Sequence, residues 1–168
     1  IRAKEFATAA HAAVGQVRKY TNEQYIVHPI EVAEMVAAVD GSVEMVAAAY
    51  LHDVVEDTQV ELPLIRELFG EEVASLVYWL TDVSRPEDGN RAARAEMNRL
   101  HTAAAPAAAK TIKLADTISN TRSVIAHDKK FAKVYLMEKQ LLLEHLKEGD
   151  SRLYKVAEDI IRKWNEVT

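Results

Sequence analysis

Residues 42–57 read Ser-Val-Glu-Met-Val-Ala-Ala-Ala-Tyr-Leu-His-Asp-Val-Val-Glu-Asp. The first part of this stretch is largely apolar and helical in character. His52, Asp53, Glu56 and Asp57 then place a histidine and three acids close together. Acidic side chains are rarely buried unless they are paired or bound to a metal. We therefore expect a divalent cation to neutralise this stretch, since a His-Asp pair can bind one.

The composition around this stretch is that of a folded protein. The chain has 168 residues, of which 49% are hydrophobic and 28% are charged, and we predict one domain over residues 1–168. No apolar run approaches the ~20 residues that span a membrane, and no signal-peptide pattern begins the chain. The sequence has no cysteine, which excludes disulfides and thiolate metal sites and fits a reducing compartment. We accordingly predict a cytoplasmic protein without a membrane partner.

The net charge of −5 argues against nucleic-acid binding over a broad basic face. A local basic cluster could still hold a small anionic ligand. We therefore expect a small molecule rather than a nucleic acid as the partner, and we leave the oligomeric state open, with a homodimer among the options.

The residue pattern favours helices throughout. Gly and Pro are few, at 5 and 4, and period-two alternation between turn residues is absent. We predict an all-α, single-domain helical bundle of roughly eight to ten helices. Pro29 should occupy the first position of one helix, and Ser42 should cap the next. The predicted helices cover about residues 3–17, 28–39, 43–56, 62–69, 71–81, 91–104, 107–126, 130–147 and 152–166.

Four residues beside or on these helices could bind one metal ion. They are His28, His52, Asp53 and Asp116, each with apolar neighbours in the sequence. Imidazole and carboxylate ligands suit Mn²⁺, Fe²⁺ or Zn²⁺, and without cysteine we favour Mn²⁺ or a similar ion over structural zinc. Taken singly, a His-Asp pair usually binds nothing, and an Asp near a Lys usually forms a salt bridge. A chance combination of a His-Pro pair at a helix start, a His-Asp pair in a buried helix and a Lys-Leu-Ala-Asp motif is far rarer than any one of them alone.

Glu56 and Asp57 follow the His-Asp pair by one helical turn. His52 and Glu56 are four residues apart, as are Asp53 and Asp57, and this spacing places side chains on one helix face. Glu56 could take a proton from an attacking water, and Asp57 could orient that water or protonate a leaving group. The alternative is a solvent-exposed acid pair, but acids at a helix C-terminus oppose the macrodipole.

Three motifs together resemble the HD-domain hydrolases, and more closely the RelA/SpoT-type guanosine bis(diphosphate) 3′-pyrophosphohydrolases. The motifs are His28-Pro29, His52-Asp53-Val-Val-Glu56-Asp57-Thr58 and Lys113-Leu-Ala-Asp116-Thr-Ile-Ser-Asn120-Thr-Arg122. The His-Asp pair indicates only the superfamily, whereas the Glu-Asp-Thr extension and Asn120 indicate the alarmone-hydrolase branch. The likeness covers about residues 6–146, so we expect a stand-alone small alarmone hydrolase without a synthetase domain.

This resemblance implies Mn²⁺ at the four ligands and an attacking water served by Glu56 and Asp57. It also implies that Arg18-Lys19 contacts the nucleotide and that Asn120 contacts the ribose-phosphate region. One departure is that residues 20–24 lack the Gly and Pro common in the family's loop before the His-Pro motif.

A bis-diphosphate substrate needs cationic partners, which several residues could supply. Arg can stack on a purine or grip phosphate, and Lys offers a mobile charge. Lys113 and Asn120 are three before and four after Asp116, on one helix face. Solvated surface cations are the alternative for Arg18 and Lys19. Tyr135 is a candidate for the nucleotide pocket, with core packing beside Phe131 as its alternative.

We predict a Mn²⁺-dependent hydrolase that converts ppGpp or pppGpp to GDP or GTP and pyrophosphate. An HD-type phosphohydrolase acting on another nucleotide such as NADPH is one alternative, and a non-catalytic nucleotide-sensing module is the other. The remaining histidines lack acid partners at metal spacing, so we interpret them as surface or packing residues. They are His11, His101, His127 and His145.

Overall fold

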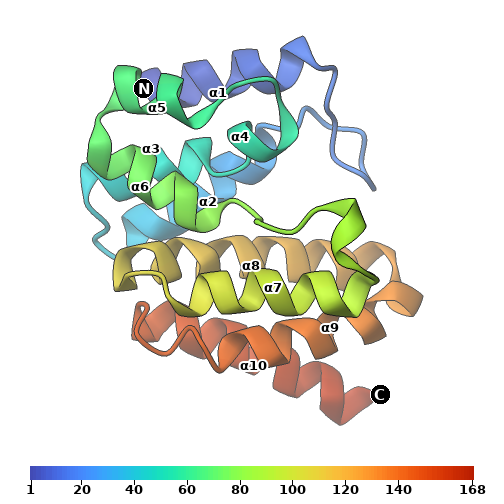
Figure 1. The fold of residues 1–168 in the computed structure, drawn as a ribbon. Helices are drawn as coiled ribbons and strands as arrows, with labels where there is room; N and C mark the ends of the chain where they lie inside the picture. Colours follow the sequence, from blue (N-terminus) through green and yellow to red (C-terminus); the bar gives the residue numbers. More distant parts are fainter. The chain divides into compact units, whose positions relative to one another are not determined.

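The computed structural model describes all residues from 1 to 168, and its regular structure consists of helices joined by loops (Figure 1). The prediction of an all-α protein with eight to ten helices is confirmed, since the chain has ten α-helices and a single isolated bridge between Val17 and Gln24. The chain divides into two compact units, residues 1–81 and residues 82–168. None of the helices has the length and apolar character that crossing a membrane requires.

The first unit contains six helices in which α3 is central. They are α1 (Arg2–Ala13), α2 (Val27–Ala38), α3 (Val43–Leu51), α4 (Val54–Asp57), α5 (Leu62–Phe69) and α6 (Glu71–Leu80). Helix α3 packs against α1, α2 and α6. Its Ala48, Ala49 and Leu51 are fully buried, and the small alanines allow neighbouring helices to approach closely. The end of α3 is therefore held firmly on several sides.

The turn signals around α2 and α3 act largely as predicted. The Ser42 hydroxyl accepts a hydrogen bond from the Met45 amide at 3.2 Å, which confirms the predicted cap of α3. In the turn before it, Asp40 has a positive φ of 61° and the Gly41 amide donates to the Val36 carbonyl at 2.9 Å. The prediction for Pro29 is wrong by two positions, because α2 begins at Val27. Pro29 still lies in the first turn, where amides need no helical acceptor.

The predicted helix over residues 43–56 is interrupted in the structure. Helix α3 ends at Leu51 and α4 begins at Val54, with His52 and Asp53 between them. The Asp57 amide donates to the Asp53 carbonyl at 2.9 Å, so these two acids remain one turn apart. The interruption separates the histidine, at the end of α3, from the acids on α4.

The second unit is built around the long helix α8. It contains the short 3₁₀ turn η1 (Pro86–Asp88), α7 (Arg91–Ala103), α8 (Ala107–His127), α9 (Lys129–Leu143) and α10 (Ser151–Val167). Helix α8 packs against α9 and α10, and its Ile112, Leu114 and Ile118 are fully buried. The Asp150 carboxylate caps α10 by accepting from the amides of Arg152 and Leu153. Asp116 lies in the middle of the buried helix α8.

Candidate metal centre and catalytic acids

Three of the predicted ligands come together at helix ends in the first unit. His28 lies in the first turn of α2, His52 directly follows α3 as its C-cap residue and Asp53 directly precedes α4. The two histidines are buried, with 1% and 2% of their surfaces exposed. The Asp53 side chain is 15% exposed. A site assembled from helix ends in a packed unit has ligands whose positions are fixed by the fold.

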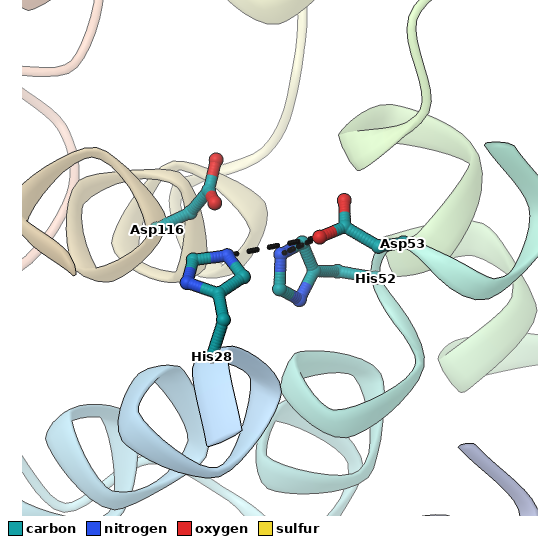
Figure 2. Close-up of side chains that lie close together, drawn as sticks. All are labelled: His28, His52, Asp53 and Asp116. Atoms are coloured by element: carbon teal, nitrogen blue, oxygen red, sulfur yellow. Dashed lines mark ion pairs between the residues drawn. The ribbon is translucent and has the colours of Figure 1, made fainter. Parts of the chain in front are cut away.

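The three side chains converge on a common point. The Asp53 Oδ2 atom lies 3.1 Å from His52 Nε2 and 3.7 Å from His28 Nε2. The candidate ligand atoms of all three residues are within 4.8 Å of one another. Figure 2 shows both imidazole rings directed at the Asp53 carboxylate.

Hydrogen bonding decides which His52 nitrogen carries the proton. The His52 Nδ1 atom lies 2.6 Å from the Ala49 carbonyl oxygen, which can only accept. Nδ1 is therefore protonated in neutral His52, and Nε2 presents a lone pair toward the Asp53 carboxylate. A lone pair facing an anion favours a cation between them, and this backbone bond is how proteins orient metal-binding histidines. The donor set of two imidazoles and a carboxylate fits a divalent transition metal.

Tyr25 supports the Asp53 carboxylate from the loop before α2. Its hydroxyl donates to Asp53 Oδ2 at 2.6 Å. The Arg18 guanidinium lies 5.9 Å from the centre of the Tyr25 ring, within cation–π range. The Lys19 ammonium lies 5.2 Å from the centre of the Tyr20 ring, and Lys19 is exposed. Of the two predicted nucleotide contacts, Arg18 is therefore the one connected to the candidate metal centre, through Tyr25.

The predicted catalytic acids lie beside Asp53. Carboxylate oxygens of Asp53, Glu56 and Asp57 are within 4.8 Å of one another. Glu56 is exposed and Asp57 is half-buried. Burial raises the pKa of the Asp57 carboxyl above its ordinary value, and the charge of Asp53 raises it further, while a hydrogen bond from Gln16 opposes the rise. The pKa of Asp57 is therefore higher than that of an ordinary exposed aspartate, so Asp57 holds a proton more readily.

The second unit carries the other predicted residues on one face of α8. Asp116, also labelled in Figure 2, is 7% exposed. Its two oxygens accept hydrogen bonds from the Lys113 ammonium and the Asn120 amide, each at 3.0 Å. Lys113, Asp116 and Asn120 therefore form one hydrogen-bonded group within this unit, as their spacing predicts.

A cationic pocket of about 260 Å³ lies within the second unit. Five of its lining residues are basic and two are acidic; they are Arg91, Arg94, Arg99, Lys113, Lys139, Asp82 and Glu138. The Arg91 guanidinium binds Glu138 through two hydrogen bonds of 2.7 and 3.0 Å. The Arg94 Nε atom is buried and has no hydrogen-bond partner. An excess of cations with an unsatisfied buried donor is suited to an anion.

Tyr135 lies between an aromatic and a cationic neighbour on α9. Its ring centre is 5.7 Å from that of Phe131, and the Lys139 ammonium lies 4.8 Å from the Tyr135 ring centre. Tyr135 thus touches both the apolar partner proposed for it and a lysine that lines the cationic pocket.

Sequence reasoning missed several residues around the site. His11 is 1% exposed, so its interpretation as a surface residue is wrong and only the packing interpretation stands. Its Nδ1 atom lies 2.7 Å from Gln16 Oε1, and Gln16 Nε2 donates to Asp57 Oδ2 at 3.1 Å. Arg94 and Lys139 were also missed. Gln16 links His11 to Asp57, and helical spacing contains no signal for such an indirect contact.

Comparison with known proteins places these features in a family. A family model described as an HD domain matches residues 3–142, which extends over both units. A probable guanosine-3′,5′-bis(diphosphate) 3′-pyrophosphohydrolase of Synechocystis is 46% identical over 84 residues, which are 50% of this chain and 11% of the relative. The Aquifex aeolicus enzyme of the same name is 33% identical over 123 residues, covering 73% of this chain and 17% of the relative. The chain thus spans less than a fifth of these curated relatives.

A solved structure resembles the chain over nearly its whole length. It is described as a metazoan ortholog of SpoT that hydrolyzes ppGpp and plays a role in starvation responses. The TM-score is 0.86 with 25% sequence identity, and the match covers 96% of this chain and 93% of that one. The similarity therefore extends over nearly the whole helical fold.

Proposed function

Because the chain belongs to the HD domain family, we propose that it is a metal-dependent phosphohydrolase that removes the 3′-pyrophosphate from ppGpp or pppGpp. The observation that carries the proposal is the convergence of two buried imidazoles on Asp53, beside Glu56 and Asp57. The names of the relatives supply the substrate. Neither a buried histidine pair nor an acid cluster would by itself indicate a substrate.

His28, His52 and Asp53 would hold the cation in the first unit, and we propose Asp116 as the fourth ligand. Asp116 is suited to this role because Lys113 and Asn120 already orient its carboxylate. We propose Mn²⁺, since imidazole and carboxylate ligands without a thiolate suit it. A bound divalent cation would supply Lewis-acid polarisation of a phosphoryl oxygen and a lowered pKa of water.

The acids would move the protons of the hydrolysis. The water oxygen bonds to the phosphorus attached to the 3′ oxygen, and the bond between that phosphorus and the 3′ oxygen breaks. Glu56, which is exposed, takes a proton from the water. Asp57 gives a proton to the leaving 3′ oxygen, and its raised pKa supports this role. The products are GDP or GTP and pyrophosphate.

The basic residues would bind the polyanionic nucleotide. The cationic pocket, which contains Lys113, offers more positive than negative side chains to phosphate groups. Arg18, whose guanidinium lies over the Tyr25 ring, would contact the nucleotide near Asp53. Asn120 and Tyr135 are proposed contacts of the ribose and base regions, and Lys19 is a peripheral phosphate contact.

Lys139 gives the pocket an expected pH dependence. Burial, with a smaller contribution from the charge of Lys113, lowers the pKa of Lys139 from 10.5 to about 8. Protonated Lys139 attracts phosphate, so nucleotide affinity should fall as pH rises through about 8. Lys139→Met should raise KM by about 10-fold at pH 7, as for loss of one charged hydrogen bond, and flatten this dependence. KM measured between pH 6.5 and 9 checks both the rise in KM and the flattened pH dependence. If the variant keeps the pH dependence of the wild type, Lys139 is not the group that causes it.

The same substitution should stabilise the free protein. The pKa of Lys139 is lower in the folded state than the unfolded value of 10.5. Native protein therefore binds fewer protons between about pH 8 and 10.5, and its stability rises with pH in this window. Below pH 8 the buried charge is destabilising in full, so Lys139→Met should raise the midpoint of thermal unfolding at pH 7. A lower midpoint would indicate that the lysine stem is needed for packing.

The proposed function is tested by incubating the chelator-treated protein with ppGpp, with and without Mn²⁺. We expect pyrophosphate and GDP to appear in equal amounts only when Mn²⁺ is present. A parallel panel with pppGpp, NADPH and GTP distinguishes the substrates. Faster phosphate release from NADPH would select that alternative. Binding of ppGpp without any product, in protein shown to contain the metal, would select the sensing module.

A further inference from the structure

His11 is a buried histidine of α1 outside the predicted metal site. It is 1% exposed, and its Nδ1 atom lies 2.7 Å from the side-chain oxygen of Gln16. An amide oxygen can only accept, so His11 Nδ1 must carry a proton. The other nitrogen, Nε2, is buried without a hydrogen-bond partner. A buried N–H without a partner costs more than a bare lone pair, which makes the neutral Nδ1–H form the one that fits this environment.

The bond to His11 fixes the direction of the Gln16 amide. With its oxygen bound to the His11 N–H, Gln16 directs its NH₂ group away from the ring. That group donates to Asp57 Oδ2 at 3.1 Å. If the amide were reversed, an oxygen would face the carboxylate and an NH₂ group would face the His11 N–H. His11 therefore determines that Asp57 receives a donor rather than a second acceptor.

The same ring also contacts Tyr25. The centres of the His11 and Tyr25 rings are 4.7 Å apart, with the rings tilted by 50°. Such aromatic contacts hold both rings in place. Tyr25 in turn donates its hydroxyl to Asp53 Oδ2 at 2.6 Å. One side chain on α1 is thus connected to both acids, to Asp57 by a hydrogen bond and to Asp53 by packing.

We propose that His11 is a positioning residue for the hydrolase, which holds Gln16 so that it orients Asp57 and holds Tyr25 so that it orients Asp53. This inference rests on the proposed function for its kinetic consequence, but its structural part stands on the four contacts alone. The contacts run from His11 to Asp57 through Gln16 and from His11 to Asp53 through Tyr25, so each acid is reached through an intermediate side chain.

Two substitutions separate the hydrogen bond from the ring contact. His11→Phe keeps a ring against Tyr25 but removes the N–H that orients Gln16. His11→Asn removes the ring, while its side-chain amide can replace the Nδ1 donor. His127→Phe is the matched control, because it makes the same change at an exposed histidine. If His11→Phe does not fold, Gln16→Leu removes the donor to Asp57 from a half-buried position instead.

The kinetic expectation is specific to each variant. His11→Phe should lower kcat by roughly 10- to 100-fold, the scale of a misplaced catalytic group, with KM and Mn²⁺ affinity unchanged. His11→Asn should recover most of this kcat but weaken Mn²⁺ binding by roughly 10-fold, as for loss of support to a metal ligand. Equal losses of kcat in both variants, accompanied by equal losses of thermal stability, would overturn the proposal in favour of simple packing.

A measurement independent of activity tests the structural part. Nitrogen-15 NMR of the metal-free protein should show His11 as the neutral Nδ1–H form. The Gln16 side-chain amide signal should move in His11→Phe and stay near its original position in His11→Asn. Observation of the Nε2–H form, or an unmoved Gln16 signal in His11→Phe, would overturn the inference even if the protein hydrolyses ppGpp. If the wild type has no activity, the proposed function fails while these spectra still decide about His11.

Discussion

Glu56→Gln is expected to retain the divalent cation and to lower kcat by about 10²- to 10⁴-fold, the usual contribution of general acid–base catalysis. The glutamine amide has nearly the same shape but cannot take a proton from water. Glu56 is exposed and lies within 4.8 Å of Asp53 and Asp57, so its replacement should leave the buried ligands undisturbed. Single-turnover hydrolysis of ppGpp, together with metal analysis of the same sample, provides the measurement.

The matched control is Glu67→Gln, which makes the same change at an exposed acid of α5. Its kcat should equal that of the wild type. If Glu56→Gln retains wild-type turnover with the metal bound, Glu56 is not the base. Loss of the metal from this variant would instead make Glu56 a ligand, and the assignment of the four ligands would have to change.

Asp53→Asn should change activity and stability in opposite directions. The substitution removes the anionic ligand that both imidazoles face, so Mn²⁺ binding and turnover should fall to background. In the metal-free protein, however, the charge of Asp53 acts unfavourably on Asp57, whose pKa it raises. Asparagine removes this repulsion and still offers an oxygen to Tyr25. We expect the metal-free variant to be more stable than the wild type by roughly 0.5–2 kcal/mol.

Thermal unfolding with and without Mn²⁺ checks this expectation. A cation present at a free concentration of 100 times its Kd stabilises the folded state by about 2.7 kcal/mol. The wild type should therefore show a clear rise in Tm when Mn²⁺ is added. The variant should start from a higher Tm and show no rise. A Mn²⁺-dependent rise of wild-type size in Asp53→Asn would place the metal elsewhere in the protein.

The sequence predicts the helices well where capping chemistry is local. Ser42 and Asp150 cap α3 and α10 through hydrogen bonds within their own turns, and such interactions depend on neighbouring residues only. Local capping signals do not predict the break between α3 and α4 at His52 and Asp53. The apolar pattern of α3 continues past these two residues into Val54 and Val55. The packing of α3 against three other helices is a tertiary effect that helical periodicity does not record.

The candidate site likewise contains residues that short motifs predict and residues that only tertiary contacts bring together. His28, His52, Asp53 and Asp116 stand in recognisable motifs, so their candidacy follows from the sequence. His11 and Gln16 act on Asp57 across about forty residues of chain, and no short motif contains such a separation. Arg94 on α7 and Lys139 on α9 likewise line the same pocket although they are far apart in the sequence. Residues that support a site from other elements become visible only in three dimensions.

The hydrogen bond from Tyr25 to Asp53 gives the protein an intrinsic optical signal. The near-ultraviolet absorption of a phenol changes with the strength of the bond its hydroxyl makes, and Tyr25 donates to an oxygen of a proposed metal ligand. A cation that draws electron density from this carboxylate would weaken it as an acceptor. Loading of the metal should therefore be readable as a difference spectrum of unlabelled protein, and Tyr25→Phe would identify the signal by abolishing it.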